Sequence, residues 1–594
     1  MSEPRKMLAT YLADGVEAAS EAENGRTVFT RPLDIVHSCD LDPEKPLPWR
    51  TALYVTEEGV APEKSARDAL SGGSVGEKLA EDVELVSRSD DFSALIVDGG
   101  RYALKNARIA MPTKSDGKNV CDFAGLGSAV AAFNGGRVDL EDCEIVTEGV
   151  AKCMVYADNG ADAVVKNCRM EAGGGTLYDG YVNNADFNYM VAPPWVLGIT
   201  GNARGTNIMG DRTSMVIVNS DVKARNWGVL STDNGEGNLL AVIDSTLTVT
   251  GGEADKTNPY FRQFGSGYGT YILGCDEDFR GVTINAGTYV GIARDGNAVY
   301  RSSRGRIRAL SARSGETLYE GEGKGNISRL RSDAFGIMAH GNAELTLTDG
   351  TEMDTENAAF LLKSGGVHIR VDGGARLAPR DGVLLQIIDD DDMTVGMDFH
   401  SPIGQRFNTT FDEKAGWPSE NGQITAQMPP PDPSKMPPPP PMPEGEEPPE
   451  PPRFDVSFTL ADTALTGNVY NGSGYYGQRA KELAVTLEAG AALTGCISAT
   501  ETIHVDENGK QNTHFTSEEY WYLGHVANRP FFHGDNTVSV VLEAGSVWNA
   551  VGEGVISSLS VKDGAVLNGI LLLDGAIIVP EAGKTYTGSI IVRG

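Results

Sequence analysis

The feature that most constrains the fold is self-similarity at a fixed spacing. Cys143, in GGRVDLEDCEIV, recurs as Cys168 in GADAVVKNCRM, after a step of about 25 residues. The same step separates VIVNSDVKA, which starts at Val216, from AVIDSTLTV, which starts at Ala241. Farther along the chain, LTDGTEM from Leu347 is followed at nearly the same step by VDGGARL from Val371. A chain with such a period is built from similar units that stack on one another.

The length and composition of the repeat indicate strands. Periods of about 20 to 30 residues with alternating apolar residues and Gly, Asn or Asp corners are typical of parallel β-solenoids. The 72 glycines against 18 phenylalanines suit frequent tight corners. The spaced leucines of leucine-rich repeats are missing, and the glycine density argues against helical repeats. We therefore predict an all-β right-handed parallel β-helix with a small mixed N-terminal cap and loop insertions.

Composition divides the chain into four predicted regions. Residues 1–90 contain helix-compatible stretches, notably EKSARDALSGGSVGEKLAEDVELV, and are expected to cap the first coil. Residues 91–427 form the main β-helix with the ligand-binding face. Residues 428–452 are a proline-rich exposed segment, which cannot form a strand ladder. In residues 453–594 the coils resume as LEAGAALTG, LEAGSVWNA and VKDGAVLNG, around a long aromatic loop insertion.

The charge balance excludes two classes of partner. The chain has 82 acidic and 50 basic residues and a formal net charge of −32. This charge repels phosphate backbones and anionic lipid surfaces, so we expect neither a nucleic-acid nor a membrane partner. The opening stretch MSEPRKMLATYLADGVEAASEAENG contains no apolar signal-peptide core, which predicts a cytoplasmic protein, or an exported one if the N-terminus has been processed. The oligomeric state stays open.

The cysteines predict a buried ladder. There are seven, with no CxxC pair, so a disulfide framework is not expected. Cys143 and Cys168 occupy equivalent positions of two repeats. A buried thiol behaves as a small apolar residue, and we therefore expect these two side chains to stack inside the solenoid.

No short motif for a nucleotide loop, zinc-protease helix, nucleophile elbow or EF-hand is present. Function must then come from a surface assembled across coils. Residues 181–280 are the densest candidate, since they combine aromatic, cationic and acidic side chains with irregular loops.

The repeat period suggests one face for this candidate site. It places Asn202 over Trp227 and Thr200 over Arg225, so that Asn202, Arg204, Arg225 and Trp227 face the same side. Arginine offers a planar fork for carboxylate or polarised oxygen, and tryptophan an apolar face for a sugar or aromatic ring. The alternative for the arginines is salt bridging to the acidic surface.

Carboxylates and tyrosines complete the predicted site. A proton-abstracting or glycosyl-cleaving site needs an acid and a base around the bound group. The alternative for each aspartate is capping of turn amides, and for the histidine a hydrogen-bonded corner. The predicted catalytic residues are Asp186, Arg204, Asp211, Arg225, Asp233, Tyr268 and His340, and the predicted substrate-binding residues are Tyr189, Trp195, Asn202, Trp227 and Tyr271.

No cofactor or metal is expected. Four consecutive aspartates, Asp389 to Asp392, offer oxygens to a hard cation, and Ca²⁺ is therefore the alternative. Adjacent side chains on a strand point to opposite faces, so they converge on one ion only within a loop. The histidines at 504, 514, 525 and 533 lack close metal-ligand spacing, which favours surface or packing roles.

The coils GGRVDLEDCEIV, GADAVVKNCRM and VIVNSDVKA resemble those of the pectate-lyase-like β-helix superfamily over roughly residues 90–400 and the C-terminal tail. The resemblance implies polysaccharide lyases, glycoside hydrolases, epimerases and isomerases that use the outer face of a parallel sheet. The Ca²⁺-binding aspartates and the catalytic arginine motif of pectate lyases have no match here.

Three functions stay open. The first is a lyase, hydrolase or isomerase that acts on a carbohydrate or another polyhydroxylated or aromatic small molecule. The second is a cell-surface adhesin or structural β-helix, and the third is polymer binding without turnover. Irregular loops and an aromatic insertion favour a shaped pocket, and hence the enzyme.

We predict that deleting residues 428–452 changes the melting temperature little. Proline donates no backbone hydrogen bond, so this segment adds few bonds to a strand ladder. Thermal unfolding followed by circular dichroism checks this, and a large fall in melting temperature would mean that the segment packs on the core.

Overall fold

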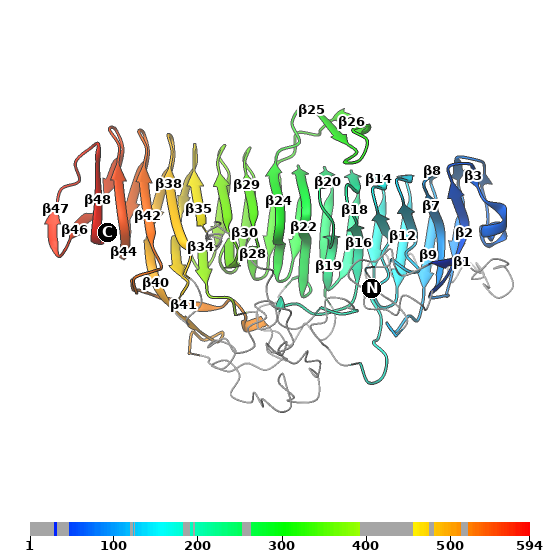
Figure 1. Ribbon diagram of the computed structural model, residues 1–594, viewed down its shortest axis with the longest axis horizontal. Coiled ribbons are helices and arrows are strands. Elements are labelled where there is room, and N and C mark those ends of the chain that lie inside the picture. Colours follow the sequence, from blue (N-terminus) through cyan, green and yellow to red (C-terminus); the bar gives the residue numbers. More distant parts are fainter. Residues whose placement is uncertain are drawn as a thin grey trace, which may run out of the picture.

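The computed structural model describes residues 29–31, 47–118, 123, 125–181, 191–193, 197–251, 263–391, 455–474, 480–511 and 521–594. In this part of the chain, coils of short strands succeed one another along the long axis of the molecule, from β2 to β48 (Figure 1). Strands of one coil pair in parallel with their counterparts in the next coil. The predicted all-β class with stacked parallel strands is confirmed.

The strands form three stacks, which we call stacks 1, 2 and 3. Long strands β22 and β24 turn a corner and belong to both stacks 1 and 2. Stack 1 contains β2 (Leu47–Thr56), β7 (Phe92–Asp98), β10 (Val130–Phe133), β13 (Val155–Asp158), β16 (Arg204–Met209), β19 (Trp227–Thr232), β22 (Gly267–Arg280), β24 (Tyr289–Arg301), β28 (Phe335–His340), β31 (Phe360–Ser364), β34 (Val383–Ile388), β37 (Asn468–Gly472) and β40 (Ile497–His504).

Stack 2 lies beside it around each corner, and it contains β5 (Leu79–Glu81), β8 (Arg101–Lys105), β11 (Arg137–Glu141), β14 (Asp162–Lys166), β17 (Ser214–Val218), β20 (Asn238–Ile243), β29 (Ala343–Leu347), β32 (Val367–Val371), β35 (Asp455–Leu460), β38 (Glu482–Leu487), β42 (Val538–Leu542) and β44 (Glu553–Val561). Stack 3 contains β6 (Glu84–Val86), β9 (Arg108–Pro112), β12 (Glu144–Glu148), β15 (Arg169–Ala172), β18 (Asp221–Arg225), β21 (Thr246–Thr250), β23 (Thr283–Ala286), β27 (Arg329–Ser332), β30 (Glu352–Thr355) and β33 (Arg376–Pro379). It is followed by a second parallel sheet of β36 (Ala464–Thr466), β39 (Ala492–Gly495), β43 (Val547–Ala550) and β45 (Val566–Asn568).

The strand register reproduces the sequence period. Val130 pairs with Val155, and Leu347 pairs with Val371, so that register partners are one repeat apart in the sequence. The C-terminal repeats stack in the same way, through β39, β43 and β45. The step from β8 to β11 is longer, because an inserted loop lies between two strands that still pair in parallel.

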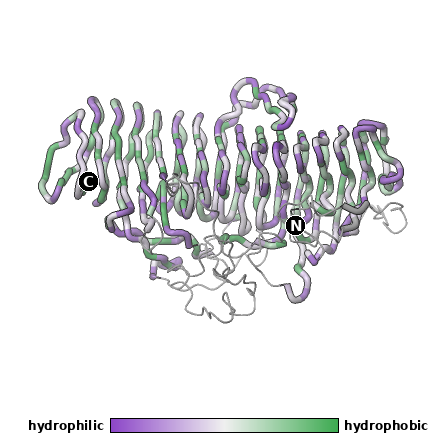
Figure 2. The backbone as a smooth tube through the Cα atoms, in the orientation of Figure 1, coloured by the Kyte–Doolittle hydropathy of each residue, from purple (hydrophilic) through white to green (hydrophobic). Residues whose placement is uncertain are grey.

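One apolar core runs through the inside of the coils. Each coil contributes inward side chains from all three stacks, for example Val130, Val138 and Ile145. Figure 2 shows hydrophobic and hydrophilic residues mixed along each coil, as strand alternation requires. Cys143 and Cys168 are buried in this core in neighbouring coils, which confirms the predicted ladder.

Asparagine and aspartate build the corners. Asp142, Asn167 and Asn219 have φ of +56°, +55° and +49° at equivalent corners. Their side chains form a hydrogen-bonded chain: Nδ2 of Asn219 donates to Oδ1 of Asn167 over 2.7 Å, and Nδ2 of Asn167 donates to Oδ1 of Asp142 over 3.1 Å. These residue types tolerate the left-handed conformation and pair along the stack.

The N-terminal region differs from the helical expectation. The stretch 63–86 contains a short 3₁₀ helix (Arg67–Ala69) and the strands β4 (Ser74–Val75), β5 and β6. β5 and β6 pair in parallel with β8 and β9 and already belong to the coils. Gly72 and Gly73 have φ of +69° and +48°, and these left-handed residues interrupt a helix.

Additional antiparallel elements decorate the coils. The hairpin β25 (Arg306–Leu310) and β26 (Thr317–Glu322) projects from one side of the stack in Figure 1 and packs on valines of stack 2. The remaining antiparallel strands are β1 (Phe29–Arg31), β3 (Gly59–Val60), β41 (Val526–Pro530), β46 (Ile570–Leu573), β47 (Ala576–Ile578) and β48 (Lys584–Arg593). A second short 3₁₀ helix spans Pro62–Lys64. The proline-rich segment 428–452 lies outside the described residues.

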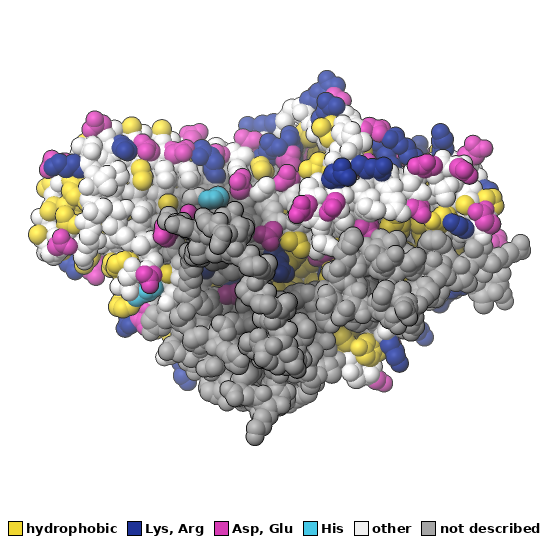
Figure 3. All heavy atoms as spheres, in the orientation of Figure 1, with side chains coloured by type: hydrophobic (Ala, Val, Ile, Leu, Met, Phe, Trp, Pro, Cys, Tyr) yellow, Lys and Arg dark blue, Asp and Glu magenta, His cyan; other side chains and the backbone are white. Residues whose placement is uncertain are grey.

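Opposite charges alternate on the outer face of stack 3. Arg108 lies between Glu84 and Glu144, at nitrogen–oxygen distances of 3.5 and 3.7 Å. Arg169 follows at 3.8 Å from Glu144, and Asp221 is its register partner in the next coil. Each exposed pair contributes little alone, but adjacent like charges would repel. Figure 3 shows acidic and basic side chains interspersed on the visible face of the described part.

No helix among the described residues has the length and apolarity needed to cross a bilayer.

We expect Glu144→Lys to lower the melting temperature more than Glu144→Gln. The lysine introduces a third positive charge between Arg108 and Arg169, at a cost of about 1 kcal/mol. The difference between the two variants should shrink at molar salt concentrations, because exposed charges are screened. Thermal unfolding at low and high salt measures it, and equal melting temperatures for both variants at low salt would contradict the prediction.

Candidate functional site

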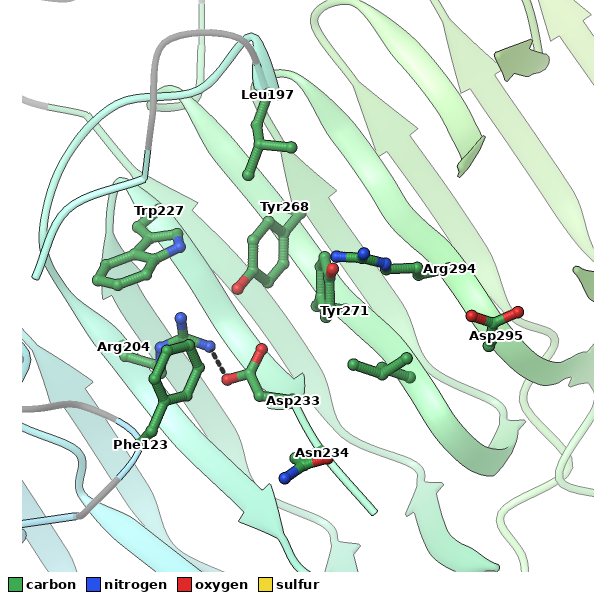
Figure 4. A pocket seen from close by; sticks show the side chains of 11 residues that line it. Phe123, Leu197, Arg204, Trp227, Asp233, Asn234, Tyr268, Tyr271, Arg294 and Asp295 are labelled. Carbon is green, nitrogen blue, oxygen red and sulfur yellow. Dashed lines mark hydrogen bonds and ion pairs between the residues drawn. The ribbon is translucent and has the colours of Figure 1, made fainter. Parts of the chain in front are cut away.

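A pocket of about 300 Å³ lies on the outer face of stack 1. Its walls come from strands of successive coils and from the loops above them (Figure 4). The lining residues are Phe123, Leu197, Arg204, Trp227, Asp233, Asn234, Tyr268, Tyr271, Leu273, Arg294 and Asp295.

A buried ion pair lies in the pocket. Arg204, the first residue of β16, bonds through Nη1 to Oδ2 of Asp233, which directly follows β19. Only 1% of the arginine side chain and 8% of the aspartate side chain are exposed. Burial raises the pKa of Asp233, although the charge of Arg204 opposes the rise. The Asp233 carboxyl group therefore releases its proton at a pH nearer to neutral than the carboxyl group of an exposed aspartate does.

Aromatic rings hold the guanidinium from two sides. The Cζ atom of Arg204 is 4.1 Å from the ring centre of Trp227 and 5.9 Å from that of Phe123. Both distances lie within the range of cation–π attraction. Together with the bond to Asp233, the rings fix the orientation of Arg204 at the pocket wall.

Two tyrosines form the next part of the wall. The Tyr268 and Tyr271 rings have centres 5.8 Å apart, and both come from β22. The hydroxyl of Tyr268 is 2.8 Å from Oγ of Ser231. Burial raises the pKa of both tyrosines, while Arg294, which hydrogen-bonds Tyr271, acts against the rise for that residue. Both phenols thus stay neutral at physiological pH and can exchange hydrogen bonds with a bound hydroxyl.

The backbone before β19 is strained where it presents Trp227. Asn226 and Trp227 have φ of +59° and +56°, a conformation that is uncommon for a bulky side chain. The backbone N–H of Trp227 donates to the carbonyl oxygens of Thr200 and Ser266 over 2.8 and 3.0 Å. Backbone strain of this kind costs about 1–3 kcal/mol per residue and clusters at ligand sites. The fold thus holds the Trp227 ring in the pocket at an energetic cost.

The structure brings together five of the residues predicted from the sequence. Arg204, Trp227, Asp233, Tyr268 and Tyr271 all line this pocket. Four of them lie in the successive strands β16, β19 and β22 of stack 1, and Asp233 directly follows β19. The repeat period pointed to Arg204 and Trp227, whereas the aspartate and the tyrosines were named for their residue types near this region.

Three predicted residues lie elsewhere in the described structure. Asn202 exchanges two hydrogen bonds with the backbone of Gly175. Asp211 is exposed and accepts a hydrogen bond from the backbone N–H of Glu236 over 2.9 Å, which is the corner role weighed as its alternative. His340 pairs with Asp390 through Nε2, 3.1 Å from Oδ2. None of these three lines the pocket.

A fourth, Arg225, also lies away from the pocket, and the predicted superposition of Thr200 on Arg225 and of Asn202 on Trp227 is wrong. Arg225 ends β18 in stack 3, where it pairs with Thr250, whereas Trp227 begins β19 in stack 1. The left-handed pair at 226 and 227 turns the chain between them. The prediction assumed that side chains alternate between the two faces of one strand from Arg225 to Trp227, and the corner between these residues breaks that alternation.

Three predicted residues, Asp186, Tyr189 and Trp195, lie outside the described residues. The sequence reasoning also missed six of the lining residues. Asn234 and Asp295 adjoin residues that alternation places outward, but Phe123 and Leu197 come from irregular loops without a period. The missed residues are Phe123, Leu197, Asn234, Leu273, Arg294 and Asp295.

The acidic run and the histidines have separate partners. Asp390 pairs with His340, and Asp391 bonds to Lys363 over 2.7 Å and to His504 over 3.0 Å. Asp392 and His514 lie outside the described residues. Among the described residues, no group of three or more His, Cys, Asp or Glu side chains is arranged to hold a metal ion.

The remaining histidines also bond to protein groups. Nε2 of His525 is 3.0 Å from Nδ2 of Asn357, and Nε2 of His533 is 2.9 Å from the carbonyl oxygen of Ser473.

Comparisons with known proteins give little. No protein-family model matches the chain, and no curated protein matches its sequence. Among solved structures, a cysteine-to-alanine mutant of the DFA-IIIase from Arthrobacter chlorophenolicus A6 covers 83% of this chain and 89% of its own, at 10% identity and a TM-score of 0.18. The same mutant in complex with DFA-III covers 77% and 85%, at 9% identity and a TM-score of 0.18. Scores this low support no inference about this chain.

We predict that Gly228→Ala displaces the Tyr268 ring. A Cβ atom at position 228 would lie 2.2 Å from Cε2 of Tyr268, so the ring must move and lose its hydrogen bond to Ser231. Overpacking of this kind costs roughly 1–3 kcal/mol. Gly366→Ala is the matched control, because a Cβ there meets no atom nearer than 3.3 Å. A crystal structure and the melting temperatures check this, and an unmoved Tyr268 ring would contradict it.

Proposed function

We propose that the protein is an enzyme that acts on a carbohydrate by acid/base chemistry, with Asp233 as the proton donor. The observation that carries the proposal is the buried Arg204–Asp233 pair in a pocket walled by aromatic rings. The volume of about 300 Å³ matches the small end of the range for ligand pockets. A pocket of this size suits one or two sugar rings.

The walls fit a polyhydroxylated ligand. Aromatic faces pack against the apolar C–H surfaces of a sugar ring, while tyrosine hydroxyls and arginines bond to its oxygens. Trp227 and Phe123 supply the first kind of surface, and Tyr268, Tyr271 and Arg294 supply the second.

The electrostatics fit proton transfer. A carboxyl group whose pKa is raised by burial holds its proton closer to neutral pH and can donate it to a leaving oxygen. The Arg204 guanidinium then stabilises the resulting carboxylate, since its bond to Asp233 is already formed. Lyases, hydrolases and isomerases all use such a donor, and the proton transfer itself needs no cofactor.

A second carboxylate lies at the far end of the pocket. Asp295 is exposed, and Figure 4 shows Tyr271 between it and Asp233. When one pocket contains a buried carboxyl group and an exposed carboxylate, the buried group suits the role of acid and the exposed group suits the role of base. We assign Asp295 as the candidate base.

We expect Asp233→Asn to reduce turnover about 10²- to 10⁴-fold with little change in ligand binding, because the amide keeps the shape but cannot donate the carboxyl proton. Activity of the wild-type enzyme should fall as pH rises through the raised pKa of Asp233, since the donor form disappears. Product release from a panel of di- and oligosaccharides measures turnover.

Arg204→Ala and Arg225→Ala form a matched pair for the same assay. The first should abolish activity, because the carboxylate that Asp233 becomes after proton transfer would be buried without its counter-ion. The second changes a residue of stack 3 outside the pocket. Melting temperatures confirm that each variant is folded. Full activity of folded Asp233→Asn on a substrate that the wild-type protein turns over would refute the proposed role.

A further inference from the structure

An acidic residue interrupts the apolar interior of stack 2. One inward-facing ladder of stack 2 runs through register partners of successive coils, and every position but one is apolar. The ladder is Tyr102, Val138, Ala163, Met215, Leu240, Glu277, Ala298, Leu345, Ile369, Phe458, Val485, Val540 and Leu559. Burying a carboxyl group in such surroundings is costly unless its hydrogen bonds are made.

Glu277 accepts a hydrogen bond through one oxygen of its carboxyl group. The Oγ1 atom of Thr270 donates to Oε2 of Glu277 over 2.7 Å. Both residues belong to β22, on either side of the corner at Gly274, which has φ of +63°. The bond therefore ties the limb of β22 that carries Tyr268 and Tyr271 to the limb that lies in stack 2.

Two buried polar atoms beside this bond lack a partner among the described residues. They are Oε1 of Glu277 and the hydroxyl oxygen of Tyr300. A Cβ atom placed on Gly291 would lie 3.2 Å from Cγ2 of Thr270 and 3.4 Å from the Tyr300 hydroxyl. Gly291 therefore lies beside both groups, and a side chain at this position would press on the Thr270 methyl group and the Tyr300 hydroxyl.

We propose that the coil interior between β22 and β24 binds one structural water molecule, held by Oε1 of Glu277 and the hydroxyl of Tyr300. Internal waters of folded proteins bond to otherwise unsatisfied polar groups, with roughly two to four partners each. The water completes the hydrogen bonds of a neutral glutamic acid: the carboxyl O–H donates to the water, and the water donates to the tyrosine oxygen.

The electrostatics agree with the neutral acid. Burial raises the pKa of Glu277 to about 8, although the neighbouring hydroxyl groups of Thr270 and Thr232 oppose the rise. The titratable groups that Glu277 affects are the Cys275 thiol and the Tyr300 phenol, and burial raises the pKa of both. Among the described residues, no charged group contributes to the shift of the Glu277 pKa.

The ring of Tyr300 is held for this role. It stacks on Phe279 with centres 4.7 Å apart and planes 5° apart. Tyr300→Phe keeps this stacking and removes only the hydroxyl. If the hydroxyl has no water, its removal is neutral or stabilising, because an unsatisfied buried group disappears. If it holds the water, its removal lowers the melting temperature and leaves the water with fewer partners.

A crystal structure of the full chain, grown below pH 7 and resolving ordered waters, tests the site directly. The expected result is one water oxygen at about 2.5–3.2 Å from both Oε1 of Glu277 and the Tyr300 hydroxyl. Direct contact of the two side chains, or no water between them, overturns the proposal. A neutral or stabilising Tyr300→Phe overturns it as well.

The protonation state is tested with Glu277→Gln. Because the pKa of Glu277 is higher in the folded chain than in the unfolded chain, stability that is present below about pH 4.5 is lost as pH rises towards 8. The unfolding equilibrium constant of the wild-type protein, relative to that of Glu277→Gln, should grow about tenfold per pH unit over this window and level off above it. The same ratio for Glu344→Gln, an exposed change on β29 two strands away in stack 2, should show no such window.

A flat ratio for Glu277→Gln overturns the neutral acid and with it the proposed hydrogen-bond pattern. These measurements use stability and structure alone, so they are independent of any catalytic activity of the pocket.

Discussion

The parallel hydrogen-bonded ladder between successive coils is the constraint on which the whole structure depends. A single coil has three short strands and no partner for their backbone groups or inward side chains. The next coil satisfies both at once, and so each coil repeats the register of the one before it. Side chains at equivalent positions therefore form continuous rows, and each row experiences one environment along the molecule.

This dependence explains what could be predicted from the sequence. The repeat period is the strand register itself, so the all-β class, the parallel stacking and the buried Cys143–Cys168 row followed from the letters alone. The stretch 63–86 has residue types that suit a helix, but it forms short strands and a 3₁₀ turn. The glycine pair at 72 and 73, which is left-handed in the structure, was the better signal within this stretch.

The site was predicted in part for the same reason. The repeat spacing pointed to Arg204 and Trp227, and the acidic and aromatic residues close to them in the sequence included Asp233 and Tyr268, which also line the pocket. Arg225 was placed on the wrong face because strand alternation was continued across Asn226, where two successive left-handed residues turn the chain. Phe123 and Leu197 come from loops whose path the period does not describe. Neither could be assigned to the pocket without the structure.

The alternating charges of stack 3 restrict how such a chain can change in length. Solenoids grow and shrink by whole coils, and loss of the coil that carries Glu144 would bring Arg108 next to Arg169. Loss of two neighbouring coils would instead bring Arg108 next to Asp221 and keep the alternation. In this part of the molecule, the alternation of charges is therefore kept only when coils are inserted or deleted two at a time. The apolar core imposes no such restriction to even numbers of coils.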